Sequence, residues 1–166
     1  MIDPAKAVAF TGHRPEKIRG GKDETCAEVQ YIKDELKRLI LDKISGGCIW
    51  FLTGMAMGAD IWAAETVLSL KKEHPYIRLV AAVPFPGQSD GFPQSWKERY
   101  RAVLSRCDEV HTISLQRQPG CYMLRNKWLV EHSAHIIGVY NGSRGGSMQT
   151  LNMALLNGSD IKIIHC

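Results

Sequence analysis

The fold of this chain is decided by residues 139–150, VYNGSRGGSMQT. The apolar run that leads into them, HIIGVY at 135–140, is short, rich in β-branched residues and bounded by Asn, which predicts a buried strand. Residues 147–157, after the glycine turn, predict a helix. A strand, a glycine turn and a helix in this order point free backbone N–H groups and a helix N-terminus at an anion, most often a phosphate.

The glycine turn carries the groups that such an anion site needs. Gly145 and Gly146 let the backbone approach a ligand closely, and Arg144 supplies positive charge. Ser147 can cap the helix and touch the ligand, and Asn141 lies where the strand ends. An ordinary strand-to-helix turn with a Gly-Gly kink would look the same, because two adjacent glycines are a weak motif.

Strands and helices alternate along the rest of the chain. Apolar runs predict further strands at 5–10, 48–53, 77–83, 108–115 and 160–165. Apolar residues at spacings of three and four predict helices at 24–45, 60–73, 95–106 and 122–133. This alternation predicts an α/β fold, a single Rossmann-like three-layer αβα domain of residues 1–166 with a mainly parallel sheet.

Composition places the chain among ordinary globular proteins. It has 166 residues, 45% of them hydrophobic and 23% charged, and its net charge of +4 does not by itself indicate a nucleic-acid binder. The five cysteines are scattered and odd in number, which argues against a disulfide framework and for a reducing compartment. No signal peptide and no membrane-spanning run is visible, so we expect a cytoplasmic protein without a membrane partner.

The loop after the first strand, TGHRP at 11–15, is the second candidate for ligand binding. Arg14 could hold a phosphate through two hydrogen bonds, and Thr11 or the Gly12 amide could bond a ribose or phosphate beside His13. The alternative is an arginine paired with a surface carboxylate and a histidine that closes a turn. In parallel sheets ligands bind at the carboxyl ends of strands, where this loop and the loop after residue 140 are expected to meet.

Three other loops should reach the same edge. Residues 53–60, TGMAMGAD, form a second glycine turn that lacks the G-x-G-x-x-G spacing of a dinucleotide fingerprint. Asp60 most simply caps the following helix, and Glu65 either reaches the site or faces solvent. From these loops the predicted ligand-binding residues are Gly54, Gly58, Asp60, Pro84, Arg125 and Asn126.

No metal-ligand pattern such as H-E-x-x-H and no nucleophile elbow occurs, so we predict no metal and no cofactor other than a bound nucleotide.

The loop motifs together resemble a known family. TGHRP at 11–15, GMAMGAD at 54–60 with AAE at 63–65, PFPGQ at 84–88, YMLRN at 122–126 and GGS at 145–147 are similar to the YpsA-like branch of the SLOG superfamily. The superfamily also holds DprA, a single-stranded-DNA-binding protein, and the LOG phosphoribohydrolases. The resemblance implies a Rossmann-like fold that binds a nucleotide or an ADP-ribose-like ligand. SLOG relatives often self-associate, which leaves a homo-oligomer open.

The chain departs from the LOG enzymes at the motif P-G-G-x-G-T-x-x-E. When Gly145-Gly146 is placed on its first two glycines, Met148, Gln149 and Asn152 stand for the third glycine, the threonine and the glutamate. Cleavage of a glycosidic bond needs a carboxylate, so a hydrolase here would have to use another one. The candidate carboxylates are Asp60, Glu65 and Asp90.

Three functions follow from these observations. We favour a nucleotide-binding module, with a ligand-sensing or signalling role and no turnover. The second reading is a hydrolase that cleaves an N-glycosidic or phosphate linkage with Glu65 or Asp60 as the acid or base. The third is single-stranded DNA binding as in DprA. It is not favoured because the basic residues at 14, 17, 19 and 22 have no aromatic residues between them.

Overall fold

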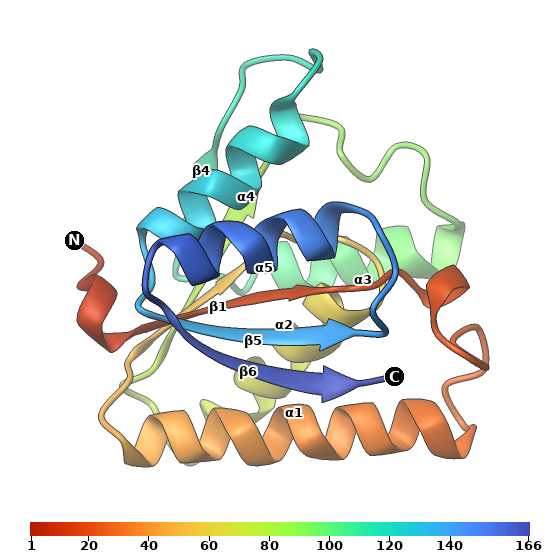
Figure 1. Ribbon diagram of the computed structural model, residues 1–166. Coiled ribbons are helices and arrows are strands. Elements are labelled where there is room, and N and C mark those ends of the chain that lie inside the picture. Colours follow the sequence, from red (N-terminus) through yellow and green to blue (C-terminus); the bar gives the residue numbers. More distant parts are fainter.

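The computed structural model describes residues 1–166, and its centre is a six-stranded sheet with helices on both faces (Figure 1). The strands are β1 (Ala7–Gly12), β2 (Trp50–Thr53), β3 (Arg78–Val83), β4 (Glu109–Thr112), β5 (His135–Tyr140) and β6 (Asp160–His165). They lie in the order β4-β3-β2-β1-β5-β6, and every neighbouring pair is parallel. The predicted α/β, Rossmann-like class is confirmed, and the sheet is parallel throughout.

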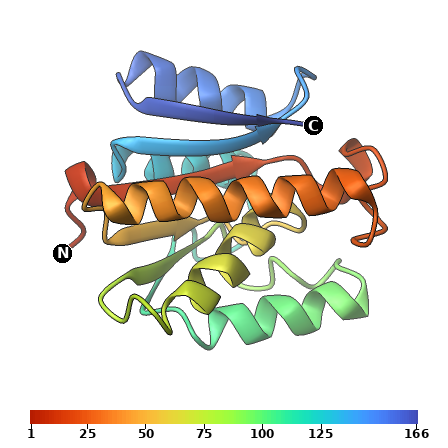
Figure 2. The ribbon, with the colours of Figure 1, turned by 90° about the horizontal axis from the view of Figure 1, so that it is seen from below.

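Five α-helices cover the sheet. They are α1 (Ala27–Ser45), α2 (Ala59–Leu70), α3 (Gln94–Leu104), α4 (Cys121–Glu131) and α5 (Gly146–Leu156). Two 3-10 turns, η1 (Pro4–Lys6) and η2 (Pro15–Lys17), flank β1. Helices α1, α2 and α3 pack on one face, and α4 and α5 pack on the other (Figures 1 and 2). None of the helices is both long and apolar enough to cross a membrane.

The strand order places a switch point between β1 and β5. From β1 the chain moves outward through β2 and β3 to β4, and it then returns across the sheet to β5 on the other side of β1. The connections that leave β1 and β5 therefore run to opposite faces of the sheet. In open parallel sheets this divergence leaves a crevice at the carboxyl ends of the two strands.

Several element boundaries differ from the sequence-based prediction, among them those of the first and fourth strands. The first strand begins at Ala7 because Asp3 accepts a hydrogen bond from the Ala5 amide (3.1 Å) and caps η1. The strand then continues to Gly12, which pairs with Val139 of β5. The fourth strand covers only Glu109–Thr112 of the predicted 108–115, at the edge of the sheet.

Helix α1 begins three residues later than predicted, and this leaves Glu24 free to join other elements. Its carboxylate accepts hydrogen bonds from Trp62 Nε1 of α2 (2.9 Å), from Lys33 of α1 and from Arg99 of α3. Arg99 also binds Glu65 of α2 through two bonds of 2.7 Å. This ion-pair network holds the three helices of one face together.

The Glu24 network makes stability depend on pH. Burial disfavours the charge on Glu24, but the hydrogen bonds from Arg99, Lys33 and Trp62 outweigh it and lower the pKa to about 2. A carboxyl whose pKa is lower in the folded state stabilises fully above its unfolded pKa and less as pH falls toward the folded value. The contribution of Glu24 is therefore present above about pH 4.5 and lost toward pH 2.

We expect Glu24→Gln to lower the free energy of unfolding at pH 7 by about 1 kcal/mol, since the pair is partly exposed to solvent. The corresponding fall in Tm is about 2–4 °C. Urea denaturation at pH 7 and pH 3 measures the effect, which should shrink at the lower pH. Glu28→Gln, at an exposed ion pair with Arg19, is the control and should change little. If Glu24→Gln lowers the free energy of unfolding equally at both pH values, the lowered pKa of Glu24 is contradicted.

Candidate functional site

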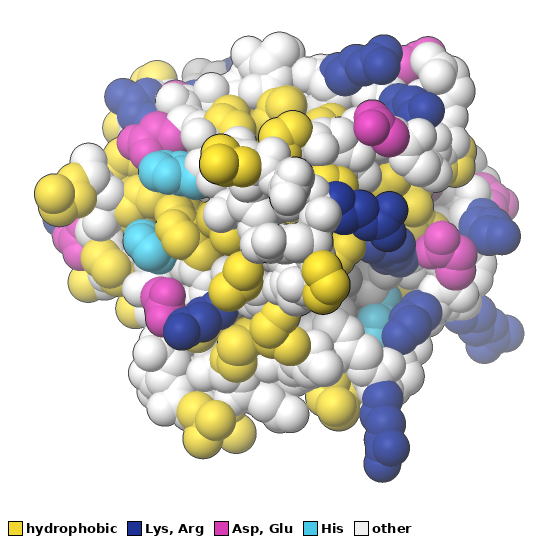
Figure 3. Space-filling model, turned by 90° about the horizontal axis from the view of Figure 1, so that it is seen from above, with side chains coloured by type: hydrophobic (Ala, Val, Ile, Leu, Met, Phe, Trp, Pro, Cys, Tyr) yellow, Lys and Arg dark blue, Asp and Glu magenta, His cyan; other side chains and the backbone are white.

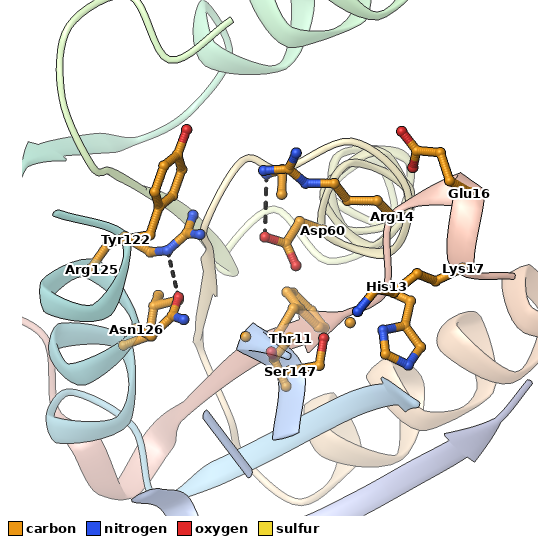
Figure 4. Close-up of a pocket in the computed structure, with 15 residues that line it drawn as sticks. Thr11, His13, Arg14, Glu16, Lys17, Asp60, Tyr122, Arg125, Asn126 and Ser147 are labelled. Carbon is orange, nitrogen blue, oxygen red and sulfur yellow. Dashed lines mark hydrogen bonds between the residues drawn. The ribbon is translucent and has the colours of Figure 1, made fainter. Parts of the chain in front are cut away.

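A cavity of about 430 Å³ opens at the carboxyl ends of β1 and β5, at the switch point (Figure 4). Its lining comes from β1 and the following loop, from the start of α2, from α4 and from the start of α5. The residues are Phe10, Thr11, Gly12, His13, Arg14, Glu16, Lys17, Ala56, Asp60, Tyr122, Arg125, Asn126, Leu129, Gly146 and Ser147.

Most of the residues predicted to bind ligand meet in this cavity. They are Thr11, Gly12, His13, Arg14, Asp60, Arg125, Asn126, Gly146 and Ser147. Five others, Gly54, Gly58, Pro84, Asn141 and Gly145, do not line it. Four of these five lie next to the lining. Gly54, Gly58 and Asn141 adjoin residues of the lining, and Gly145 is the N-cap of α5. Pro84 is buried and accepts a hydrogen bond from the Ser114 amide, away from the lining.

Two glycines bring the loop after β1 against α2. A Cβ on Gly12 would lie 2.4 Å from the Cβ of Ala59, so only glycine fits between strand and helix. Gly58 has φ 86°, a conformation that favours glycine, and an added Cβ there would lie 2.7 Å from the carbonyl oxygen of His13. These approaches place Asp60, in the first turn of α2, beside the end of β1.

The lining of the cavity includes two buried charged groups, Asp60 and Arg125. Asp60 is 5% exposed and Arg125 is 6% exposed. Arg125 donates to the Gly54 carbonyl through Nη1 and to Asn126 Oδ1 through Nε (2.7 Å). The Gly54 carbonyl also accepts from Gln88 Nε2 (3.0 Å). Arg125 is thus held in place by hydrogen bonds to the backbone and to its neighbour on α4.

One oxygen of Asp60 has no hydrogen-bond partner. Asp60 Oδ2 accepts from the Ala56 amide (3.3 Å), whereas Oδ1 is buried and has no hydrogen-bond partner. Burial raises the pKa of Asp60 above its ordinary value, although the charges of Arg125 and Arg14 and the Ala56 amide act in the opposite direction. A buried acceptor without a partner is costly, and a ligand N–H or O–H would satisfy it.

A hydrogen-bond network around Asn141 joins the two loops that border the cavity. Asn141 Oδ1 accepts from the Ser143 amide (3.0 Å) and lies 2.7 Å from His13 Nε2, and its Nδ2 donates to the Lys17 carbonyl (2.9 Å). Lys17 Nζ in turn donates to the Arg144 carbonyl (3.0 Å). The loop after β1 and the loop after β5 are therefore fixed to each other.

His13 is a neutral side chain at the edge of this network. Burial lowers its pKa, and the nearby Lys17 lowers it further against the effect of the bond to Asn141. The Asn141 oxygen is an acceptor, so the neutral ring carries its proton on Nε2 and leaves Nδ1 as an acceptor.

The N-terminus of α5 opens into the same cavity. Gly145 is the N-cap, with φ 150°, and no side chain caps the helix. Gly146 and Ser147 line the cavity, and Ser147 is 8% exposed. The first amides of a helix have no intrahelical partner and carry partial positive charge. An anion placed here would be bound by these amides and by the nearby Arg14 and Lys17.

The surface around the cavity is basic. Lys and Arg side chains gather on the side of the molecule toward which the strands point (Figure 3). The Arg14 side chain forms no hydrogen bond or ion pair, and Lys17 Nζ donates only to the Arg144 carbonyl, so neither cation forms a salt bridge with a carboxylate. No group of three His, Cys, Asp or Glu side chains is placed to hold a metal ion.

The other carboxylates proposed for catalysis lie outside the cavity. Glu65 follows Asp60 by five residues, which turns it about 140° around the helix axis at 3.6 residues per turn. It faces α3 and is bound to Arg99. Asp90 is exposed on the loop between β3 and α3 and lines an adjacent cavity.

Tyr122 is a lining residue that we did not select from the sequence. It lies three residues before Arg125 and four before Asn126, so the three share one face of α4. That helical spacing was the signal available in the sequence. To select Tyr122 from that spacing, one would have to know which face of α4 points toward β1.

We expect Gly54→Ala to lower the free energy of unfolding by about 1–3 kcal/mol, as overpacking does in other cores. The added Cβ would lie 2.2 Å from Arg125 Nη1 and 2.9 Å from Asp60 Oδ2, so the buried guanidinium would have to move. Urea denaturation is the measurement. Gly91→Ala is the control, because a Cβ there meets nothing within 4 Å. Equal stability of the two variants would mean that Arg125 is not held as described.

Two solved structures share this fold. DNA processing protein A from Helicobacter pylori, whose structure was studied for its single-stranded DNA binding mode, superposes with a TM-score of 0.64 and 18% identity. The match covers 96% of this chain and 65% of that protein. DNA processing protein A (DprA) from Streptococcus pneumoniae gives a TM-score of 0.63 and 16% identity, covering 98% of this chain and 51% of that one.

Relatives in sequence extend over nearly the whole chain. The UPF0398 protein of Bacillus pumilus (strain SAFR-032) is 28% identical over 162 residues, which are 96% of this chain and 87% of the relative. The UPF0398 protein of Bacillus thuringiensis (strain Al Hakam) is also 28% identical, over 96% of this chain and 88% of its own length. The sequence signature of YpsA, the YspA SLOG family, matches residues 8–163. The protein therefore belongs to this family, as the motifs at 11–15 and 54–60 predicted.

Proposed function

We propose that the protein binds a nucleotide or a nucleotide-derived, ADP-ribose-like ligand in the cavity at the switch point, as a ligand-sensing module. The observation that carries the proposal is one cavity with two complementary features. Its lining includes the uncapped N-terminus of α5 and the buried carboxylate of Asp60, whose Oδ1 has no hydrogen-bond partner. A phosphate attached to a sugar or base with hydrogen-bond donors matches both features.

The phosphate half of this proposal rests on the α5 N-terminus and two cations. The amides of Gly146 and Ser147 donate to phosphate oxygens, and Arg14 and Lys17 supply the opposite charge. The network through Asn141 holds the loops of both cations against α5 before any ligand arrives. Such preorganisation reduces the entropy cost of binding.

The sugar or base half rests on Asp60, Asn126 and Tyr122. The Asp60 carboxylate accepts from a hydroxyl or an amino group, and Asn126 of the same lining offers an amide. Tyr122 contributes an aromatic wall. A cavity of about 430 Å³ has the size of a small-molecule site, and its few polar groups converge as in such sites.

A sensing role is favoured over turnover by the positions of the carboxylates. Asn152, where the LOG motif has its glutamate, is exposed on α5 and lies outside the cavity. Glu65 is occupied by Arg99. Asp60 is the only carboxylate buried in the lining, and Glu16 is exposed at its rim.

The phosphate position is tested by Gly146→Asp. A Cβ at Gly146 meets nothing closer than Asn126 Nδ2 at 3.9 Å, so the new side chain fits, and its charge repels a phosphate. In a thermal-shift panel of AMP, ADP, ATP, NAD and ADP-ribose, a ligand at 100 times its Kd should add about 2.7 kcal/mol of stability to the wild type. This shift should be lost in Gly146→Asp.

The matched control is Gly146→Asn, which has the same size without the charge and should keep most of the shift. A nucleotide that stabilises wild type and Gly146→Asp equally would place the phosphate elsewhere. No shift with any nucleotide would overturn the proposed function.

The hydrolase reading is tested with the same ligands. We expect each nucleotide to be recovered unchanged by chromatography after incubation with the protein, since Asp60 acts as a ligand-binding acceptor. Formation of a free base or of phosphate that disappears in Asp60→Asn would instead identify a hydrolase. Burial raises the pKa of Asp60, which would suit it to donate a proton in such a reaction.

Single-stranded DNA is the second candidate, supported by the fold shared with DprA and by the basic edge of the molecule. A short oligonucleotide belongs in the same panel. Stabilisation by the oligonucleotide alone, with affinity that falls steeply as salt is added, would favour this candidate.

A further inference from the structure

A separate cavity of about 400 Å³ lies at the other end of α4 from the candidate site. Helix α4 begins at Cys121, next to the cavity at the switch point, and ends at Glu131 (Figure 1). The separate cavity lies between this end of α4 and the start of the edge strand β4. Its lining residues are Met1, Ile2, Glu109, His111, Trp128 and His132. None of these residues lines the cavity at the switch point, so the two cavities are distinct.

Three stacked rings form the aromatic part of this lining. The Trp128 ring lies 4.2 Å from the His132 ring, measured between centroids, with 18° between the two planes. The His111 ring lies 4.8 Å from the Trp128 ring at 33°. All three side chains are half-buried, so each has a surface that a ligand can reach.

Hydrogen bonds decide which nitrogen of each histidine carries the proton. His111 Nε2 lies 2.9 Å from Glu109 Oε2, and His132 Nδ1 lies 2.8 Å from the Trp128 carbonyl oxygen. Both oxygens are acceptors, so in the neutral rings these two nitrogens carry the protons. His111 Nδ1 and His132 Nε2 are therefore acceptors, and the Glu109 carboxylate is a third.

The charges around the cavity are negative. Glu109 has no Lys or Arg partner, and its one ion pair forms only when His111 is protonated. The last carbonyl groups of α4 carry partial negative charge, and no basic side chain lies in the last turn of this helix. No Lys or Arg side chain lines the cavity. A cation placed there would therefore be attracted from two sides.

We propose that this cavity binds a guanidinium group. A guanidinium is a planar cation that stacks on aromatic rings and donates up to five hydrogen bonds, which matches three stacked rings and three acceptors. An ammonium group is a compact charge that would use the acceptors without the rings. A metal ion is disfavoured, since no group of three His, Cys, Asp or Glu side chains is placed to hold one.

The same chemistry comes from two sources, a free guanidino compound or an arginine side chain of a polypeptide. The volume of about 400 Å³ lies within the range of small-molecule sites, about 300–1,000 Å³, and it accepts either source. This inference does not depend on the proposed function, because the two cavities share no residue.

NMR titration tests the inference through the indole N–H signal of Trp128, at pH 8, where free imidazole is neutral. The chain has four tryptophans, and Trp128→Phe identifies this signal by its loss. The probes are L-arginine and the peptide acetyl-Gly-Arg-Gly-amide. Each is compared with its citrulline counterpart, which has a side chain of the same shape without the charge. We expect at least one arginine probe to bind at least about tenfold more tightly than its citrulline counterpart, the worth of one charged hydrogen bond.

Two variants should weaken binding of that arginine probe. Glu109→Gln keeps the size of the side chain and removes its charge, whereas His132→Phe keeps a ring on Trp128 and removes the acceptor nitrogen. Each should raise the Kd at least about fivefold, because each removes one hydrogen bond to the cation. Glu28→Gln, on α1 at the other face of the sheet, is the control and should bind as the wild type does. A thermal melt of each variant confirms that it is folded.

The two probes also identify the source of the guanidinium. Tighter binding of the peptide supports an arginine of a protein partner, and tighter binding of free arginine supports a small molecule. Equal binding of arginine and citrulline probes, or a difference that survives both variants, would overturn the inference. So would a lysine peptide, acetyl-Gly-Lys-Gly-amide, that binds as tightly as the arginine peptide, since the rings would then play no part.

Discussion

The buried guanidinium of Arg125 is the interaction on which the candidate site depends. A charge in the interior is tolerated only when hydrogen bonds and an opposite charge compensate it. Here the Gly54 carbonyl accepts from Arg125, and Asp60 lies against the same glycine. Because Arg125 belongs to α4 while Gly54 and Asp60 belong to the loop and helix after β2, this contact fixes the two faces of the sheet relative to each other. The contact between Arg125 and Gly54 therefore sets the positions of both walls of the cavity.

Glycines are as important as charged residues in this arrangement. Gly54 leaves room for the guanidinium, and Gly12 lets β1 approach Ala59 of α2. The approach carries Asp60 to the end of β1, where its Oδ1 remains without a partner. A protein interior rarely leaves a buried acceptor unsatisfied, and such exceptions mark sites with a role beyond packing. Asp60 and the uncapped α5 N-terminus line one cavity, and the proposed ligand, with both donors and negative charge, matches these two features.

The family assignment and the geometry bear on different parts of the function. Membership of the YspA SLOG family and the fold shared with DprA place the chain among proteins with a Rossmann-like core. They do not select a ligand. Asn152, an exposed amide, stands where the LOG enzymes have their glutamate, and Glu65, a candidate to replace that glutamate, is tied to Arg99. Both positions argue that any chemistry here differs from that of the LOG enzymes. The proposal of a sensing module rests on that difference.

The order of the elements, the parallel α/β class and the loops that meet at the switch point could be predicted from the sequence. These features depend on local patterns, such as apolar periodicity and glycine turns. Which side chains of those loops point inward depends on tertiary packing, and the sequence alone did not predict it. Asp60 and Glu65 lie on the same helix, and the sequence made both of them candidates for the site. The packing of α2 against β1 and α3 places Asp60 in the lining of the cavity and turns Glu65 toward Arg99. The cavity lined by Arg14 and Tyr122 likewise brings together a loop and a helix more than 100 residues apart, and no local pattern in the sequence predicts such a juxtaposition.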